Sequence, residues 1–149
     1  SDEREASRRT IYAFIKRSMV VPMLEVLDLC DTTRSSAKRQ VTTVAPQALS
    51  LFNGDFVNRQ SQLLAARLLR ETGDDPIRQI ERAYLLTLCR PPTDTEMVSL
   101  LVFLNEVATE FRNEAATTAR DESAAQICRR ALEQVCRAIF NLNEFVYTD

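Results

Sequence analysis

The sequence predicts an all-α fold: an irregular helical bundle, orthogonal or up-and-down, of about six to seven helices with little or no sheet. The 149 residues include only two glycines, whereas sheets and hairpins usually need glycine for turns with positive φ. Alanine, leucine, arginine and glutamate, which favour helices, are abundant. The length suits one domain, so we expect residues 1–149 to form a single helical domain. Because Ser1 begins helix-like sequence without a methionine, we expect a C-terminal fragment of a larger protein.

Three helices are predicted in the first third of the chain. Residues 3–18 carry an apolar stripe with helical spacing, and residues 23–29 follow a proline that breaks that helix. Residues 30–44 form a polar, irregular link whose β-branched end favours an extended chain but is too short to found a sheet. Pro46 opens a third helix, residues 47–52, which Asn53 and Gly54 end.

Two further helices follow, each with clear boundary residues. Asp55 is expected to cap a helix that runs to about Thr72 and ends at Gly73. Its predicted inner face consists of Phe56, Leu63, Leu64 and Leu68. Asp75 before Pro76 marks the start of the next helix, which is expected to run to Cys89. Its apolar stripe consists of Ile77, Ile80, Tyr84 and Leu88.

The last two predicted helices are the longest. Thr93 and Glu96 have the spacing of a capping box, and the apolar stripe that follows extends to Phe111. Residues 113–121 are small and polar and are expected to be the least ordered stretch. The final helix is predicted at about 122–143, with an inner stripe of Ala124, Ile127, Ala131, Val135, Ala138, Ile139 and Leu142.

The composition excludes several classes of function. Without histidine, the chain lacks the commonest general base and metal ligand, so a Ser-His-Asp or Cys-His site cannot form within it. The net charge of −2 and the absence of interleaved aromatic residues argue against nucleic-acid binding. No apolar run is long enough to span a membrane. We therefore expect no catalytic residue, no metal and no cofactor in this chain.

The four cysteines are Cys30, Cys89, Cys128 and Cys136, and no two have the Cys-x-x-Cys spacing of a zinc or redox motif. Cys128 and Cys136 lie eight residues apart on one predicted helix, about 12 Å along its axis and too far for a disulfide. We expect four buried or half-buried thiols; a bridge from Cys30 to another helix is the alternative.

Polar side chains that could form a binding site occur in several segments. A cluster at the C-terminal end of the last helix either satisfies the helix end or takes part in binding, and the first interpretation is favoured. The candidate residues are Arg9, Lys16, Arg17, Arg39, Gln47, Asn53, Asn141, Asn143 and Glu144.

Four segments together resemble a known family: Arg9–Arg17, Val41–Asn53, Arg90–Glu96 and Asn141–Tyr147. In this order they resemble the PSD-type C-terminal domain of unknown function in large planctomycete proteins, which often also carry a cytochrome c-like domain. The resemblance covers about Arg8 to Asp149. The chain departs from the family pattern at Ser36, where a cysteine is common, at Cys89, which replaces a glycine, and at Leu132, where a tryptophan is frequent.

The resemblance implies an extracytoplasmic setting, periplasmic or at the cell surface, but supplies no activity. Any haem would bind elsewhere in the parent protein, because this chain lacks a Cys-x-x-Cys-His motif. Our leading hypothesis is a non-catalytic interaction or scaffold domain that packs on upstream domains or on another protein. The alternative is a ligand-binding or catalytic-support domain whose site the preceding domain completes. Convergence of Arg9, Arg39, Asn141 and Glu144 in an open cleft would favour the alternative, whereas internal pairing would favour the scaffold.

Overall fold

The computed structural model describes residues 54–118 and 122–146. The chain divides into two units, Ser1–Ser50 and Leu51–Asp149, and every described residue belongs to the second. Of the described residues 84% are helical and none lies in a strand, so the all-α prediction is confirmed for this part of the chain. The helices expected at 3–18, 23–29 and 47–52 lie outside it, so the predicted count of six to seven is not confirmed. The single-domain interpretation stays a prediction.

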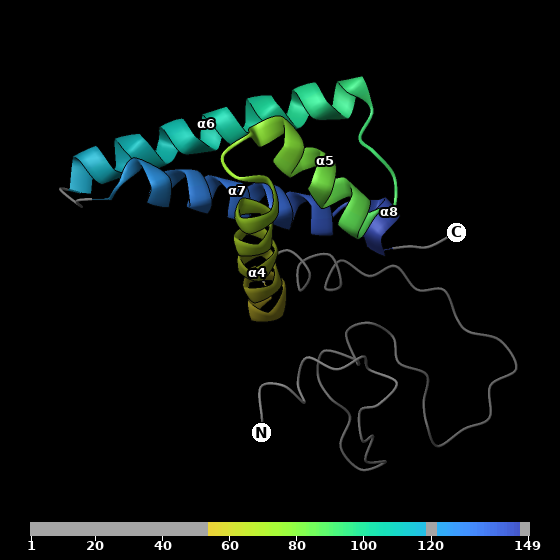
Figure 1. The fold of residues 1–149 in the computed structure, drawn as a ribbon. Coiled ribbons are helices and arrows are strands. Elements are labelled where there is room, and N and C mark those ends of the chain that lie inside the picture. Colours follow the sequence, from red (N-terminus) through yellow and green to blue (C-terminus); the bar gives the residue numbers. More distant parts are fainter. Residues whose placement is uncertain (1–53, 119–121, 147–149) are drawn as a thin grey trace, which may run out of the picture. The chain divides into compact units, whose positions relative to one another are not determined.

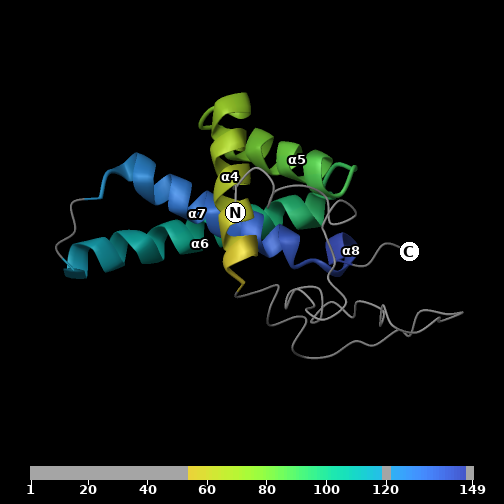
Figure 2. The same ribbon diagram turned by 90° about the horizontal axis from the view of Figure 1, so that it is seen from below.

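Five helices make up the described part of the chain (Figure 1). They are α4 (Asp55–Thr72), α5 (Pro76–Thr87), α6 (Asp94–Thr118), α7 (Ala124–Phe140) and α8 (Asn143–Val146). Helices α6 and α7 lie side by side, whereas α4 crosses α7 steeply, as the turned view also shows (Figure 2). Helix α7 contacts each of the other four. Over the described ranges, no helix is sufficiently long and apolar to cross a membrane.

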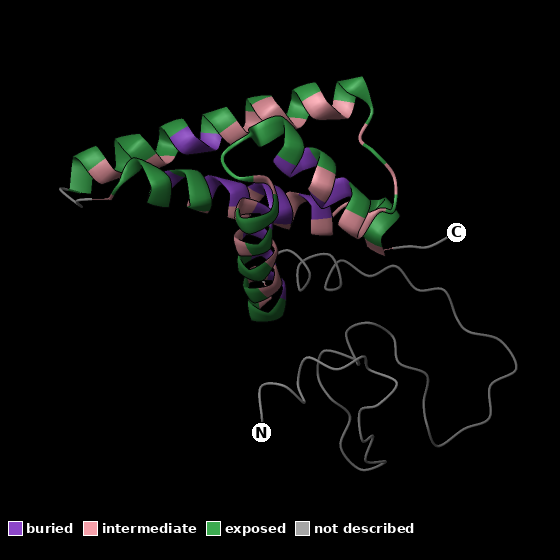
Figure 3. Cartoon of the chain, in the orientation of Figure 1, coloured by how far each residue is buried: buried purple, intermediate pink, exposed green. Residues whose placement is uncertain are grey.

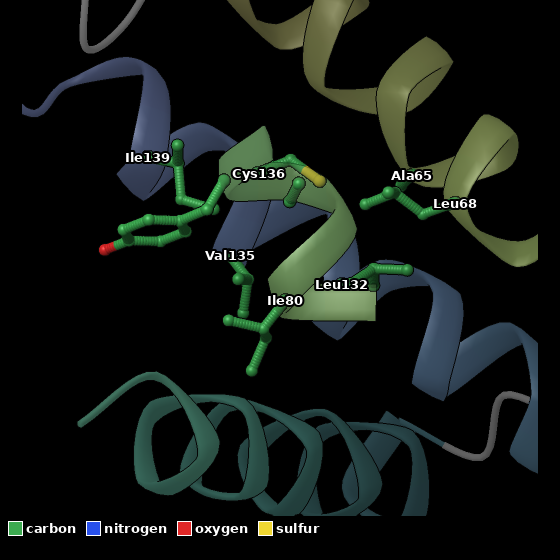
Figure 4. Packing of buried hydrophobic residues seen from close by; sticks show 9 residues of the cluster. Ala65, Leu68, Ile80, Leu132, Val135, Cys136 and Ile139 are labelled. Carbon is green, nitrogen blue, oxygen red and sulfur yellow. The ribbon is translucent and has the colours of Figure 1, made fainter. Parts of the chain in front are cut away.

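The core lies where α4, α5 and α6 meet α7, and their buried faces turn toward one another (Figure 3). Figure 4 shows how side chains from α4 and α5 converge on the apolar stripe of α7. The main cluster consists of Ala65, Leu68, Ile80, Ala83, Tyr84, Leu132, Val135, Cys136 and Ile139. A smaller cluster between α6 and α7 consists of Val107, Ala108, Ile127 and Ala131. Each fully buried large side chain stabilises the fold by about 1.5–3 kcal/mol relative to an exposed one.

The buried face of α4 differs from the expected one. Phe56 and Leu63 were predicted to face inward but are 48% and 57% exposed. Leu68 is buried as predicted, and Leu64 is partly buried against the core. The other buried residues of α4 are Val57, Ser61 and Ala65, which lie at helical spacing with Leu68. Small side chains at Ser61 and Ala65 let α4 approach α7 closely, and the Ser61 hydroxyl donates to the Val57 carbonyl at 2.8 Å. Ile77, also expected on the inner stripe of α5, is 49% exposed.

The predicted helix starts are confirmed at two of three positions. The Asp75 carboxylate accepts from the Ile77 and Arg78 amides at 3.0 and 3.3 Å. At the start of α6, the Thr93 hydroxyl accepts from the Glu96 amide and a Glu96 oxygen accepts from the Thr93 amide, which completes the capping box.

The expected cap at Asp55 is wrong. Gly54 occupies the N-cap of α4, and Asp55 is the first helical residue, where its charge favours the positive end of the helix dipole. At the other end, Gly73 has φ +66° and ends α4 as expected.

Helix α6 continues through part of the stretch that we expected to be least ordered. It ends at Thr118, so residues 113–118 are helical; residues 119–121 lie outside the described residues. The segment contains no glycine or proline, and the hydroxyls of Thr117 and Thr118 donate to carbonyls one turn earlier at 2.8 and 2.7 Å. Small polar residues without a breaker therefore continue the helix at 113–118.

The final predicted helix, 122–143, is divided in two. Ser123 caps α7 through a capping box with Gln126, and α7 ends at Phe140. The Asn141 amide then bonds the Ala138 carbonyl, and its side chain donates to the Arg137 carbonyl at 2.7 Å. This local competition by the asparagine side chain ends α7 before the short helix α8 begins.

Two of the cysteines differ from expectation. Cys136 is buried, and burial raises the pKa of its thiol to about 12. Cys89 and Cys128 are exposed rather than buried or half-buried, and all three described cysteines are free; Cys30 lies outside the described residues. Cys89 also has φ +57°, so α5 ends at Thr87 and not at Cys89. The left-handed conformation explains why a glycine suits this position in the family pattern.

Replacing Cys89 by glycine should raise the free energy of unfolding by about 0.5–1 kcal/mol. Glycine removes the strain of a Cβ in the left-handed region, and this gain exceeds the loss from the greater conformational entropy of glycine in the unfolded chain. The matched control is Cys128→Gly, at an exposed position inside α7, which should instead lower it by about 0.4 kcal/mol. Urea unfolding of the two variants measures both values. Equal signs for the two substitutions would contradict the role assigned to the Cys89 backbone.

Candidate functional site

Three of the nine candidate residues lie in the described part of the chain: Asn141, Asn143 and Glu144. Asn141 follows α7 and bonds its backbone, Asn143 is the exposed first residue of α8, and Glu144 is the next residue. The other six lie outside the described residues: Arg9, Lys16, Arg17, Arg39, Gln47 and Asn53. The position of Arg9 and Arg39 relative to Glu144, which would distinguish the two hypotheses, therefore lies outside the described part of the chain.

The Glu144 carboxylate is bound by an arginine from a distant part of the sequence. Arg90 Nε and Nη2 donate to the two Glu144 oxygens at 2.7 and 2.6 Å. Arg90 also binds Glu96 through Nη1 and Nη2, at 2.9 and 2.8 Å. We call these three residues the Arg90 cluster. It joins the turn after α5, the first turn of α6 and the helix α8.

Arg90 uses its full donor capacity in this cluster. A fifth bond runs from Nη1 to the Pro91 carbonyl at 3.1 Å, and a guanidinium group has five N–H donors. Its charged carbon also lies 5.4 Å from the centre of the Tyr84 ring, within the range of a cation–π contact. Two bidentate pairs fix the guanidinium plane in a way that a lysine ammonium could not reproduce.

The pKa values in the cluster follow from these bonds. The Arg90 guanidinium, with a smaller contribution from the Thr93 amide, lowers the pKa of Glu96 to about 2. Arg90 likewise lowers the pKa of Glu144, and the two carboxylates raise that of Arg90. Burial raises the pKa of Tyr84. Both carboxylates are therefore held ionised at neutral pH, and neither is placed to act as a general acid.

A second arginine performs the same role at the other end of the α6–α7 pair. Arg130 donates to Glu122 at 2.6 Å and to Glu114 at 3.2 Å. Its guanidinium lies 4.0 Å from the centre of the Phe111 ring. Because Glu114 and Phe111 belong to α6, this contact fastens the end of α6 to α7. Arginine, carboxylates and an aromatic ring thus recur together at both ends of the pair.

Sequence reasoning missed Arg90 as a member of the site. Arg90 entered the sequence analysis only as part of the segment Arg90–Glu96, which carries the family resemblance, and not as a candidate site residue. Glu144 belongs to another such segment, Asn141–Tyr147. The structure brings these two segments together, although Arg90 and Glu144 are 54 residues apart. A signal was present in principle, since both segments contributed to the family resemblance.

The described unit is thus an all-α bundle in which two arginine–carboxylate clusters join the ends of helices. Comparison with known proteins then supplies the family: the model of PSD1, a protein of unknown function (DUF1553), matches residues 1–104. The chain therefore belongs to this family, as the resemblance predicted. No curated protein and no solved structure matches the chain.

The family match ends at residue 104, inside α6, whereas the resemblance was expected to reach Asp149. The structure shows why the later residues belong to the same folded unit. Helix α7 follows the match, yet it contributes Leu132, Val135, Cys136 and Ile139 to the main core cluster. Without α7, the buried side chains of α4 and α5 would face water.

A chain that stops at residue 104 should therefore lose the native packing of α4 and α5. We expect the backbone amides of Ile80 and Tyr84, buried in the intact chain, to exchange hydrogen at rates close to those of an unfolded peptide. Hydrogen exchange of residues 1–104 and of the whole chain, under one set of conditions, makes the comparison. Protection of these amides in the shortened chain would show that α7 is dispensable.

The Arg90 cluster should also make stability depend on pH. The pKa of Glu96 falls from 4.5 in the unfolded chain to about 2 in the folded one, so its contribution is complete above pH 4.5 and is lost as the pH falls toward 2. Glu96→Gln and Glu144→Gln should each flatten the fall in the urea midpoint over this range. Glu106→Gln, at an exposed site on α6, is the control and should leave the fall unchanged. An unaltered fall in both cluster variants would refute the assignment.

Proposed function

We propose that the chain is a non-catalytic helical interaction or scaffold domain of a larger extracytoplasmic protein, where it packs on upstream domains or on another protein. The observation that carries the proposal is the internal pairing of Glu144 and Asn141, two of the three described polar candidates. Both Glu144 oxygens are engaged by Arg90, and the Asn141 amide bonds the end of α7. Groups committed in this way hold the fold together and are not free to bind a substrate.

The apolar surface supports the same proposal. Seven large apolar side chains in the described residues are at least 40% exposed, and they occur on α4, α5, α6 and α8. Two of them, Leu63 and Phe145, line one depression together, and a shared apolar surface of this kind is a feature of protein interfaces. The alternative, a site completed by a preceding domain, would require free polar groups beside Glu144, and Arg90 occupies that position. Membership of the PSD1 family supplies no activity, since the family is itself of unknown function.

The proposal predicts that the chain stays bound after it is cut from its parent. A specific protease site is inserted before Ser1 in the longer protein, and the cleaved sample is analysed by size exclusion with light scattering. We expect residues 1–149 to elute with the remainder of the protein or with a partner, because apolar contacts do not require the covalent link. The uncut protein is the reference.

Two results would contradict the proposal. One is a released chain that elutes as an unaccompanied monomer while the remainder is unchanged. The other concerns the compartment: the parent should be digested by a protease added to intact cells or to spheroplasts, and complete protection from it would exclude an extracytoplasmic domain.

A further inference from the structure

A groove of about 390 Å³ is lined by residues of α4, by the C-terminal ends of α5 and α7, and by α8. Its α4 wall includes Leu63 and Leu64, and Leu86 near the end of α5 contributes to its lining. On the far side are Phe140, at the end of α7, and Phe145 of α8, whose rings are 5.0 Å apart. Leu63 and Phe145 are 57% and 40% exposed, so the groove presents large apolar surface to water. We call it the α4 groove.

The Arg90 cluster helps to hold α8, which contributes Phe145 to the lining of this groove. Helix α8 has only four residues, none of them buried, so packing alone does not hold it. Beyond its backbone bonds to Leu142, its contacts are the bonds that Arg90 donates to Glu144 and the ring contact of Phe145 with Phe140. The ion pair therefore keeps Phe145 in position beside the groove.

The charge of the α4 groove has one sign. None of its lining residues is acidic, and its cation is Arg67, whose side chain is 46% exposed. Arg67 binds Glu71 at 2.6 Å, but Glu71 also binds Arg82 at 2.7 Å. Two arginines share one carboxylate, whose pKa they lower, so this triad keeps one net positive charge. A carboxylate on a partner would complement that charge.

The backbone of the groove favours a helical partner. Its described walls are helices and not strands, so no sheet edge is offered to an extended peptide. A partner must then satisfy its own backbone, as a helix does. The lining residues of α4 extend from Gln60 to Arg67, which is about 10 Å at 1.5 Å per residue, or two helical turns.

We propose that the α4 groove binds an amphipathic helix of a protein partner, with apolar side chains between Leu63 and Phe145 and a carboxylate against Arg67. The inference rests on the proposed interaction role and specifies the surface and the chemistry of the partner. It treats the exposed Leu63, which sequence analysis had assigned to the core, as a contact residue.

The test uses two synthetic peptides of about 18 residues, long enough to form helix in water. Both carry leucine at positions i, i+3, i+4 and i+7 in an alanine-rich helix; one has glutamate at the polar positions and the other lysine. Fluorescence anisotropy measures their binding to the whole chain. We expect the glutamate peptide to bind about tenfold more tightly, because a charge-assisted bond to Arg67 is available only to it.

Matched variants locate the binding. Leu63→Asp should weaken binding of the glutamate peptide at least about tenfold, whereas Val102→Asp, at a 50% exposed site on α6, should not alter it. Arg67→Gln should remove the preference for glutamate. Its control is Arg129→Gln, at a 54% exposed site on α7 that belongs neither to the lining of the α4 groove nor to this triad. Circular dichroism confirms that each variant is folded.

Several outcomes would overturn the inference: no saturable binding of either peptide, equal binding of both, or equal effects of Leu63→Asp and Val102→Asp. Self-association that Leu63→Asp abolishes would show that a second copy is the occupant instead. In each case the cleavage experiment remains independent. A chain that stays bound after cleavage but ignores both peptides would retain the proposed function and reject this surface.

Discussion

Every described helix depends on contact with α7. Its apolar stripe meets α4 and α5 on one side and α6 on the other, and α8 follows directly from its end. The buried Ala131, near the middle of α7, packs with Val107 and Ala108 of α6, whereas Leu132 and Cys136 pack with Ala65 and Leu68 of α4. The ion pairs of Arg90 and Arg130 lie at the two ends of the α6–α7 pair, beyond the buried apolar contacts. Apolar packing thus supplies the driving force, and the charged clusters fix the ends of the elements.

Much of this architecture could be predicted from local sequence. Asp75 with Pro76, Thr93 with Glu96, and Gly73 each act through bonds or conformations within a few residues, so their identity suffices to place a boundary. The α6 stripe was also correctly oriented, with Val107 and Ala108 buried. The predicted boundaries were wrong where the same local sequence is compatible with both a helix and a helix end. Residues 113–118 lack a breaker and extend the helix, whereas Asn141 ends one with its own side chain.

Other features depend on tertiary contacts that no local pattern contains. Helix α4 has apolar residues on two adjacent faces, and the small residues Ser61 and Ala65 decide which face meets α7. Hydrophobicity alone favoured Phe56 and Leu63 as core residues, because it does not take into account how closely two helices can approach each other. Arg90 similarly needs a partner 54 residues away, so only the folded chain shows that its donors are fully used. Of the candidate site, Glu144 was identified but its role as the anchor of α8 was not.

The long reach of the Arg90–Glu144 contact has a consequence for the order in which the unit assembles. Helical turns and the adjacent pairs α4–α5 and α6–α7 close short loops, whereas this contact must wait until α7 has returned along α6 and brought the chain's end back to the α5–α6 turn. Helix α8 should therefore be the last element to dock and the first to detach. Helix α8 can dock only after the preceding helices have packed. A partner that contacts Phe145 would therefore bind the folded bundle and not a partly folded chain.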